Sequence, residues 1–63
     1  MTDQIPLLHP VTEGLRRIGI GRSKGYELIA AGDLKVIKIG RRSLIAETEL
    51  QRYVASLTEA AAR

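Results

Sequence analysis

The sequence contains no cysteine and a single histidine, and these shortages restrict its chemistry. Without cysteine, the chain forms neither a disulfide nor a thiolate-bound zinc site. With His9 as the one imidazole, most other transition-metal sites lack ligands, so we expect neither a metal nor a cofactor. Paired carboxylates in a plausible pocket and a glycine-rich phosphate loop are also missing, which argues against an enzyme.

Long hydrophobic runs and aromatic residues are scarce as well. No segment approaches the roughly 20 apolar residues that a membrane-spanning helix needs. The N-terminal stretch MTDQIPLL contains an acidic residue, and its apolar part is too short for a signal peptide. These features predict a cytoplasmic protein without a membrane contact. Because Tyr26 and Tyr53 are the only aromatic residues, aliphatic side chains must form the core.

The length of 63 residues predicts one domain. A domain of this size buries only about 60% of the surface of its unfolded chain, so we expect marginal stability. We expect the folded part to span residues 9–58, with a flexible arm over residues 1–8 and a loose tail over residues 59–63.

Positive charge is concentrated in the middle of the chain. The net charge is +3, but the excess lies between positions 16 and 42, and both flanks are mildly acidic. The basic residues of this middle part are Arg16, Arg17, Arg22, Lys24, Lys35, Lys38, Arg41 and Arg42. A basic surface suits a polyanion such as a nucleic acid. Charge alone fits a solvated surface without a ligand equally well.

Two short helices joined by a glycine-containing turn are predicted in the first half. The first runs from Pro10 to Ile18, because its apolar residues recur on one face and Gly19 follows. The second runs from Arg22 to Ala31, with Tyr26 on its apolar side. Its basic first turn lies at the helix end that favours anions. The pattern is typical of a helix-turn-helix, and an ordinary helical hairpin fits it too.

The stretch KVIKIGRRSLI predicts a β-hairpin with strands near residues 34–39 and 43–46. Gly40 permits a tight loop of two or three residues. Alternation predicts three core-facing residues on these strands. They are Ile37, Ile39 and Ile45.

A third helix is predicted from Glu47 to Thr58, with an apolar stripe that closes the core. The stripe consists of Leu50, Tyr53, Val54 and Leu57. The order helix, helix, hairpin, helix predicts an α+β fold that is mostly α, namely a winged helix-turn-helix.

The segment from Val11 to Val54 resembles a known family. Its pieces IGIGRSKGYELI, GDL and IKIGRRSLI recur in order and without a gap, between a first and a last helix. They resemble the compact winged helix-turn-helix domain of phage and mobile-element excisionases, a relative of the MerR-type DNA-binding head. The resemblance implies that the second helix lies in the major groove of double-stranded DNA. It also implies that the hairpin is a wing that reaches the minor groove or its phosphates.

The family's DNA contacts carry over to specific positions. On the recognition helix they fall on Arg22, Ser23, Lys24 and Tyr26. On the wing they fall on Arg41 and Arg42, and Lys38 and Ser43 are further candidate DNA contacts there. We expect Tyr26 to be half-buried between the two helices, with its hydroxyl at a phosphate. Two adjacent arginines on a tight turn repel each other, so a DNA contact explains them better than the fold does.

The sequence departs from the family at three places. Gly21 stands where the family often has a serine or threonine helix cap. Gly25 stands where a β-branched or larger residue is common, so it offers no side chain to DNA, and Leu44 stands where a basic or polar residue is frequent. With Val36, Leu44 is expected to form an exposed apolar patch on the outer face of the wing. This patch is a candidate protein contact, although isolated surface leucines commonly have no function.

The charged residues at the end of the first helix and the histidine before it are not expected to contact DNA. Arg16 and Arg17 are expected to complement the dipole at the end of the first helix rather than to contact DNA. His9 is expected to be a solvated residue that precedes the helix.

Three classes of function fit these features. The resemblance favours an excisionase, or recombination directionality factor, that binds near attachment sites, bends DNA and promotes integrase-mediated excision. The partners would be DNA and a cognate integrase, with a monomer in solution and cooperative assembly on repeated sites. A small transcriptional repressor of a phage or plasmid promoter needs the same groove contacts. A protein-interaction module would rest on Val36, Leu44 and the C-terminal tail.

Overall fold

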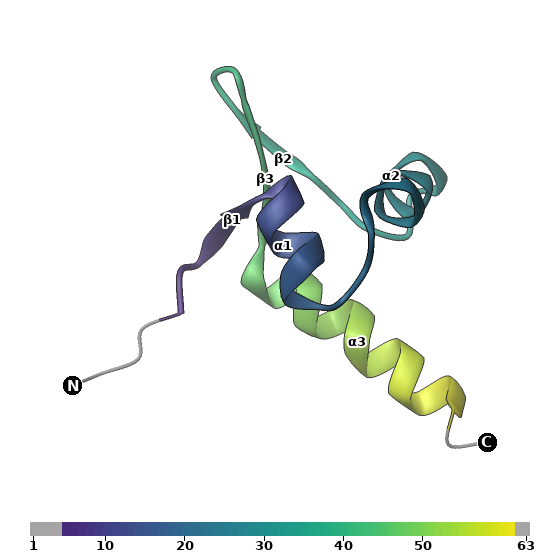
Figure 1. Cartoon of the computed structure of the whole chain (residues 1–63). Helices are drawn as coiled ribbons and strands as arrows, with labels where there is room; N and C mark the ends of the chain where they lie inside the picture. The colour runs from purple at the N-terminus through teal and green to yellow at the C-terminus, as the bar shows by residue number, and fades with distance from the viewer. Residues whose placement is uncertain (1–4, 62–63) are drawn as a thin grey trace.

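Three helices and three short strands make up the computed structural model, which describes residues 5–61 (Figure 1). In chain order they are β1 (Leu8–Pro10), α1 (Val11–Arg17), α2 (Arg22–Ala31), β2 (Ile37–Ile39), β3 (Arg42–Ala46) and α3 (Glu47–Ala61). The predicted α+β class, mostly helical and winged-helix-like, is confirmed. None of the helices within residues 5–61 has the length and apolar character needed to cross a bilayer.

The helix boundaries follow from local chemistry. Pro10, with a φ of −54°, precedes α1, where its missing N–H costs no hydrogen bond. Gly19 and Gly32 have φ values of 79° and 86° and follow α1 and α2, as glycines do in left-handed helix ends. The predicted limits of α2 are confirmed, whereas α3 continues to Ala61 and so includes part of the expected tail.

The sheet contains a strand that the sequence did not predict. Its order is β1-β3-β2, with antiparallel pairing throughout, and Leu8 of the expected arm pairs with Ala46. A strand of three residues is too short to show a hydrophobic period, and its partner lies far away in sequence. Pro10 is tolerated because β1 is an edge strand, where a missing backbone donor does not interrupt the ladder.

β2 and β3 form the predicted hairpin, and its loop contains two residues. Ile39 pairs with Arg42, so Gly40 and Arg41 make the turn. Gly40 has a φ of 59°, and no residue type other than glycine has a positive φ among those described. A glycine with a positive φ at the first turn position, followed by Arg41 without one, matches a type II′ turn, which suits the twist of a hairpin.

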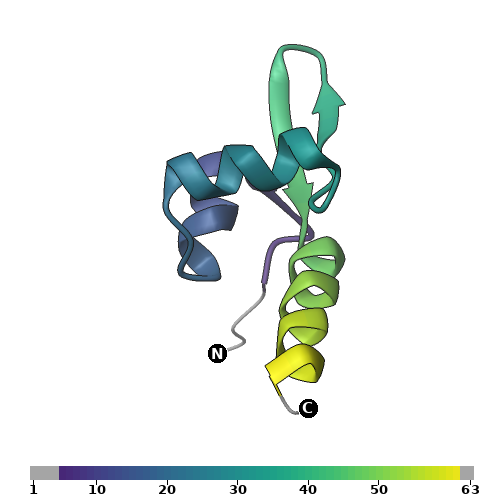
Figure 2. The ribbon, with the colours of Figure 1, turned by 90° about the vertical axis from the view of Figure 1, so that its right-hand side faces the viewer.

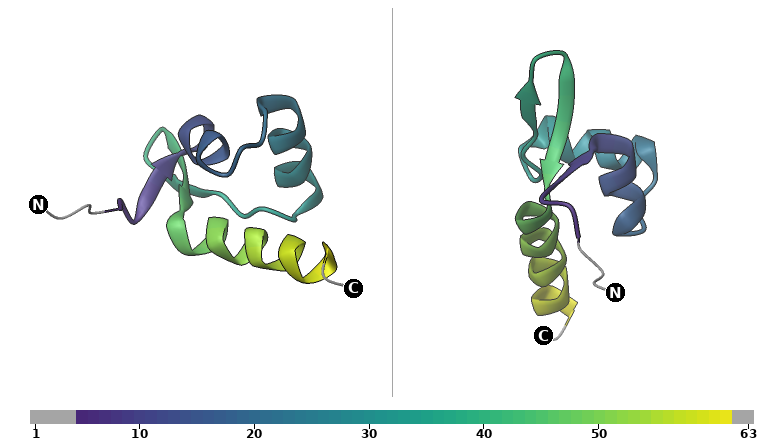
Figure 3. Two further views of the ribbon diagram at one scale, coloured as in Figure 1. Left: turned by 60° about the horizontal axis from the view of Figure 1, so that its bottom comes forward. Right: turned by 90° about the vertical axis from the view of Figure 1, so that its left-hand side faces the viewer.

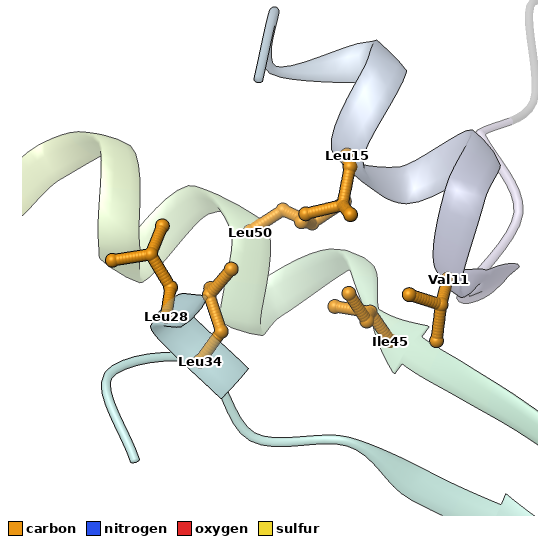
Figure 4. Packing of buried hydrophobic residues seen from close by; sticks show 6 residues of the cluster. All are labelled: Val11, Leu15, Leu28, Leu34, Ile45 and Leu50. Atoms are coloured by element: carbon orange, nitrogen blue, oxygen red, sulfur yellow. The ribbon is translucent and has the colours of Figure 1, made fainter. Parts of the chain in front are cut away.

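The core lies between the sheet and the three helices (Figure 4). Its buried residues are Val11, Leu15, Leu28, Leu34, Ile45 and Leu50. The expectation for Ile45 is confirmed, but those for Ile37 and Ile39 are wrong, because they are 42% and 52% exposed. The two-residue loop pairs Ile37 with Leu44, so both isoleucines of β2 lie on the sheet face opposite to Ile45.

The expected exposed patch of Val36 and Leu44 is also wrong. Leu44 is 8% exposed in the central strand, between its partners Pro10 and Ile37. Val36 is partly buried and packs against the core cluster. Because strand residues alternate between faces, the same register that turns Ile37 outward brings Val36 inward. The exposed apolar residues of the wing are therefore Ile37 and Ile39.

α3 closes the core with its first half alone. Leu50 is 1% exposed and Tyr53 packs partly against the cluster, but Val54 and Leu57 are 40% and 48% exposed. Figures 1 and 2 show that α3 extends away from the hairpin, so its last turns pass beyond the elements that cover its beginning. Only the first half of the predicted apolar stripe therefore packs against the core, and its second half is exposed.

Candidate nucleic-acid interface

The first turn of α2 presents basic side chains to solvent. Arg22, Ser23 and Lys24 are all exposed. Gly21 occupies the N-cap and has no side chain to accept a bond from the free N–H groups of this turn. The Lys24 Nζ lies 3.8 Å from Glu27 Oε1, but both side chains are well exposed, so this pair contributes little. The helix start therefore keeps its attraction for an external anion.

Tyr26 is half-buried, as expected, but it does not pack against the core cluster. It is 48% exposed and lies outside the core cluster. The buried side of α2 is formed by Gly25 and Leu28, with Ile29 partly buried. Tyr26 therefore lies on the open side of α2, where its ring and hydroxyl are accessible to a ligand.

Gly25 allows α2 to approach α1 closely. A Cβ built on Gly25 would overlap the side chain of Leu15, at 2.7 Å from Cδ2 and 2.9 Å from Cγ, and Leu15 is itself 1% exposed. No real side chains pack at such distances. Gly25, which the sequence showed only as a position without a side chain for DNA, is therefore needed for the packing of α2 against α1.

The wing carries its polar residues at the tip and on both faces. Arg41 is in the turn, and Lys38 pairs with Ser43 on one face while Ile39 pairs with Arg42 on the other. All of these residues are exposed. Within residues 5–61, neither Arg41 nor Arg42 forms an ion pair. In Figure 2 and in the right-hand view of Figure 3 the tip of the hairpin projects beyond the helices, so the tip is open to a large partner.

The loop between α2 and the wing is anchored by α3. Arg52 Nη2 donates to the Asp33 carbonyl oxygen at 2.7 Å, and the Lys35 N–H donates to Glu49 Oε2 at 3.1 Å. Arg52 and Glu49 also pair with each other at 2.7 Å. This pairing lowers the pKa of Glu49 and raises that of Arg52. α3 therefore fixes the loop between α2 and β2, and this loop determines how α2 lies relative to the wing.

A second polar cluster ties β1 and α1 to the start of α3, and the sequence did not reveal it. His9 Nε2 lies 2.6 Å from Glu47 Oε1, and both residues are 7% exposed. Arg17 donates to both Glu47 oxygens at 2.8 and 2.9 Å, and Gln51 Nε2 donates to Oε2 at 2.9 Å. The bonds from Arg17 and Gln51 lower the pKa of Glu47 to about 2, against a smaller opposing effect of desolvation.

This cluster corrects two expectations. His9 is buried and bonded rather than solvated, because β1 brings it against α3. Arg17 does end α1, as predicted, but its guanidinium is held by Glu47. The acidic first turn of α3 was visible in the sequence. The burial of Glu47 was not visible, since its partners Arg17 and His9 lie 30 and 38 positions away in the sequence.

Arg16 lies near the start of α2. It is exposed in the last turn of α1 and lines a hollow of about 310 Å³ together with Arg22. Thr12 and the glycines of the connection also line this hollow. Two cationic side chains from different helices therefore line the same hollow beside the uncapped end of α2.

Together, these features define a small winged-helix-like protein with exposed basic groups on its second helix and hairpin. The chain is similar to a protein of Saccharopolyspora erythraea named probable excisionase, with 37% identity over 51 residues. The matched segment is 81% of this chain and 52% of that relative, so the chain spans about half the length of the relative. This similarity supports the excisionase resemblance. No family model and no solved structure matches the chain.

Proposed function

We propose that this protein is a DNA-binding excision factor that acts beside a site-specific integrase and has no catalytic activity of its own. The observation that carries the proposal is the placement of two separate sets of basic side chains. The start of α2 and the tip of the wing are both exposed and both cationic. Among DNA-binding functions, the name of the relative, probable excisionase, favours a role in recombination.

In the proposed complex, α2 enters the major groove. Arg22 and Lys24 are long enough to reach guanine edges or phosphates, and arginine is the commonest reader of guanine. The uncapped N–H groups at Gly21 and Arg22 favour a backbone phosphate. Arg16, beside Arg22, adds a phosphate contact from α1. Tyr26, exposed on the same helix, supplies a ring and a hydroxyl to the groove.

The wing makes the second half of the contact. A narrow minor groove is strongly negative and attracts arginine side chains. Arg41 at the turn and Arg42 beside it enter or flank this groove, and Lys38 and Ser43 line its phosphates. The anchoring of the connecting loop by Arg52 and Glu49 supports a fixed spacing between helix and wing. We further propose, from the excisionase resemblance, that the DNA is bent in this complex.

The first-turn carboxylates of α3 do not oppose this role. Glu47 and Glu49 accept hydrogen bonds from Arg17 and Arg52 inside the molecule, so their charges are largely compensated. We expect a monomer in solution and cooperative binding of several copies on repeated sites, because one small domain buries little DNA surface.

The decisive experiment combines footprinting with excision. The attachment region of the element is footprinted, and excision by the cognate integrase is then measured with and without the protein. Protection near the attachment site together with stimulated excision is the expected result. Unchanged excision with silencing of a nearby promoter would establish the alternative, a transcriptional repressor. Absence of any protection would exclude DNA binding altogether.

A further inference from the structure

Ile39 occupies an unusual position at the end of the wing. It is the last residue of β2 and immediately precedes the Gly40–Arg41 turn. Its cross-strand partner is Arg42, so both side chains lie on the same face of the hairpin. Ile39 is 52% exposed and contributes nothing to the core cluster. A large aliphatic side chain is thus held at the tip beside two arginines.

The fold does not require isoleucine at this position. A β-branched residue favours a strand, but threonine meets this preference without exposing so much apolar surface. The neighbouring charges define the kind of surface that approaches the tip, since Arg41 and Arg42 select a polyanion. Within DNA, the minor groove combines negative potential with walls of sugar C–H groups, and apolar side chains of many minor-groove proteins enter it.

We propose that Ile39 packs against the deoxyribose walls of the minor groove when the wing binds DNA. Its contact excludes water beside Arg42 and so strengthens the attraction between that guanidinium and the groove. The wing then recognises the groove by shape as well as by charge. This inference rests on the proposed DNA-binding function and adds an apolar contact to it.

The same strand offers a matched control. Ile37 shares its outer face with Ile39 and is 42% exposed, so the two positions are similar in chemistry. Ile37 lies two residues further from the tip, which corresponds to about 7 Å along a strand. A contact confined to the groove involves Ile39 and spares Ile37. A general role of the outer apolar face involves both.

The test measures DNA affinity over a range of salt concentrations for Ile39→Thr, Ile39→Val and Ile37→Thr, with a short duplex that carries the footprinted sequence. Ile39→Thr is expected to weaken binding roughly tenfold, the effect of exposing most of a buried aliphatic side chain. The slope of affinity against salt should stay unchanged, since every phosphate keeps its cationic partner. Ile39→Val and Ile37→Thr should bind almost as the unaltered protein does, and both Ile39 variants should keep its melting temperature.

Three outcomes would overturn the inference. Ile39→Thr binding with unaltered affinity would show that the side chain does not contact DNA. An equal loss in Ile37→Thr would assign the effect to the whole outer face. Normal DNA binding with impaired excision would assign Ile39 to a protein partner. In each case the unaltered protein still binds DNA, whereas failure of the proposed function would appear as no binding by any variant.

Discussion

At the scale of single residues, the two buried glycines of the helices have different roles. A Cβ on Gly14 would lie 3.5 to 3.6 Å from side-chain atoms of His9, Ile45 and Leu50, which is ordinary contact. A Cβ on Gly25 would overlap Leu15. The chain therefore needs glycine at position 25 for packing, whereas position 14 has room for a methyl group.

This contrast gives a paired prediction. Gly25→Ala should lower the free energy of unfolding by about 1–3 kcal/mol, the usual effect of overpacking a core. Gly14→Ala should leave stability unchanged or raise it by up to about 1 kcal/mol, because alanine favours a helix over glycine. Urea denaturation of both variants measures the difference. Equal stabilities would mean that Leu15 finds another rotamer within the core.

The Glu47 carboxylate should dominate the acid stability of the protein. Its pKa is about 2 in the folded state, below the ordinary value of 4.5. A lowered pKa stabilises the fold above the ordinary value, and this stabilisation is lost as the pH falls from about 4.5 toward 2. Glu47→Gln should therefore lower the melting temperature at neutral pH and flatten its decline over that acid range.

The matched control for this prediction is Glu59→Gln on the exposed part of the same helix. It should leave the melting curve unchanged at every pH. A steep acid transition that persists in Glu47→Gln would place the main acid-sensitive contact elsewhere, for example at the Glu49–Arg52 pair.

At the scale of elements, the outer part of the wing lies outside the core, because residues 37–43 are all exposed. Changes at its tip should affect binding without affecting folding. The double variant Arg41→Ala, Arg42→Ala should bind DNA more weakly, and its salt dependence should decrease by about one unit of slope for each phosphate that the two arginines neutralise. Binding measured at several salt concentrations gives both quantities.

The charge-conserving variant Arg41→Lys, Arg42→Lys distinguishes charge from geometry at the tip. It should retain the salt slope, because the same number of counterions is released. If affinity at moderate salt is unchanged in the alanine variant, the wing does not contact DNA. If the lysine variant binds as weakly as the alanine variant, the guanidinium shape rather than its charge is required.

The sequence predicted some helices and strands more accurately than others. α2 was predicted with its observed limits, because basic, apolar and glycine residues mark its start, face and end. The hairpin was predicted, but its register was not, and one residue of register decides which isoleucines face the core. β1 was missed because it exists only through pairing with β3.

At the scale of the whole molecule, the dimensions limit how much DNA one copy covers. The principal extents are 39, 35 and 16 Å. One turn of B-form DNA is about 34–36 Å, or 10–10.5 base pairs. A single copy should therefore protect no more than about one turn, and a longer footprint should grow in steps of similar size as protein is added. Titrated footprinting measures the step, and a first step of two turns would indicate a preformed dimer.

The sequence by itself determined the helices, the turn at Gly40, and the concentration of positive charge in the segments that became α2 and the wing. These properties are local, because glycine, proline and the spacing of apolar residues act within a few positions. Tertiary structure alone decided that β1 forms, that His9 and Arg17 converge on Glu47, and that Ile39 faces outward. Each of these depends on contacts between distant segments or on strand register, and such contacts leave no period in the sequence.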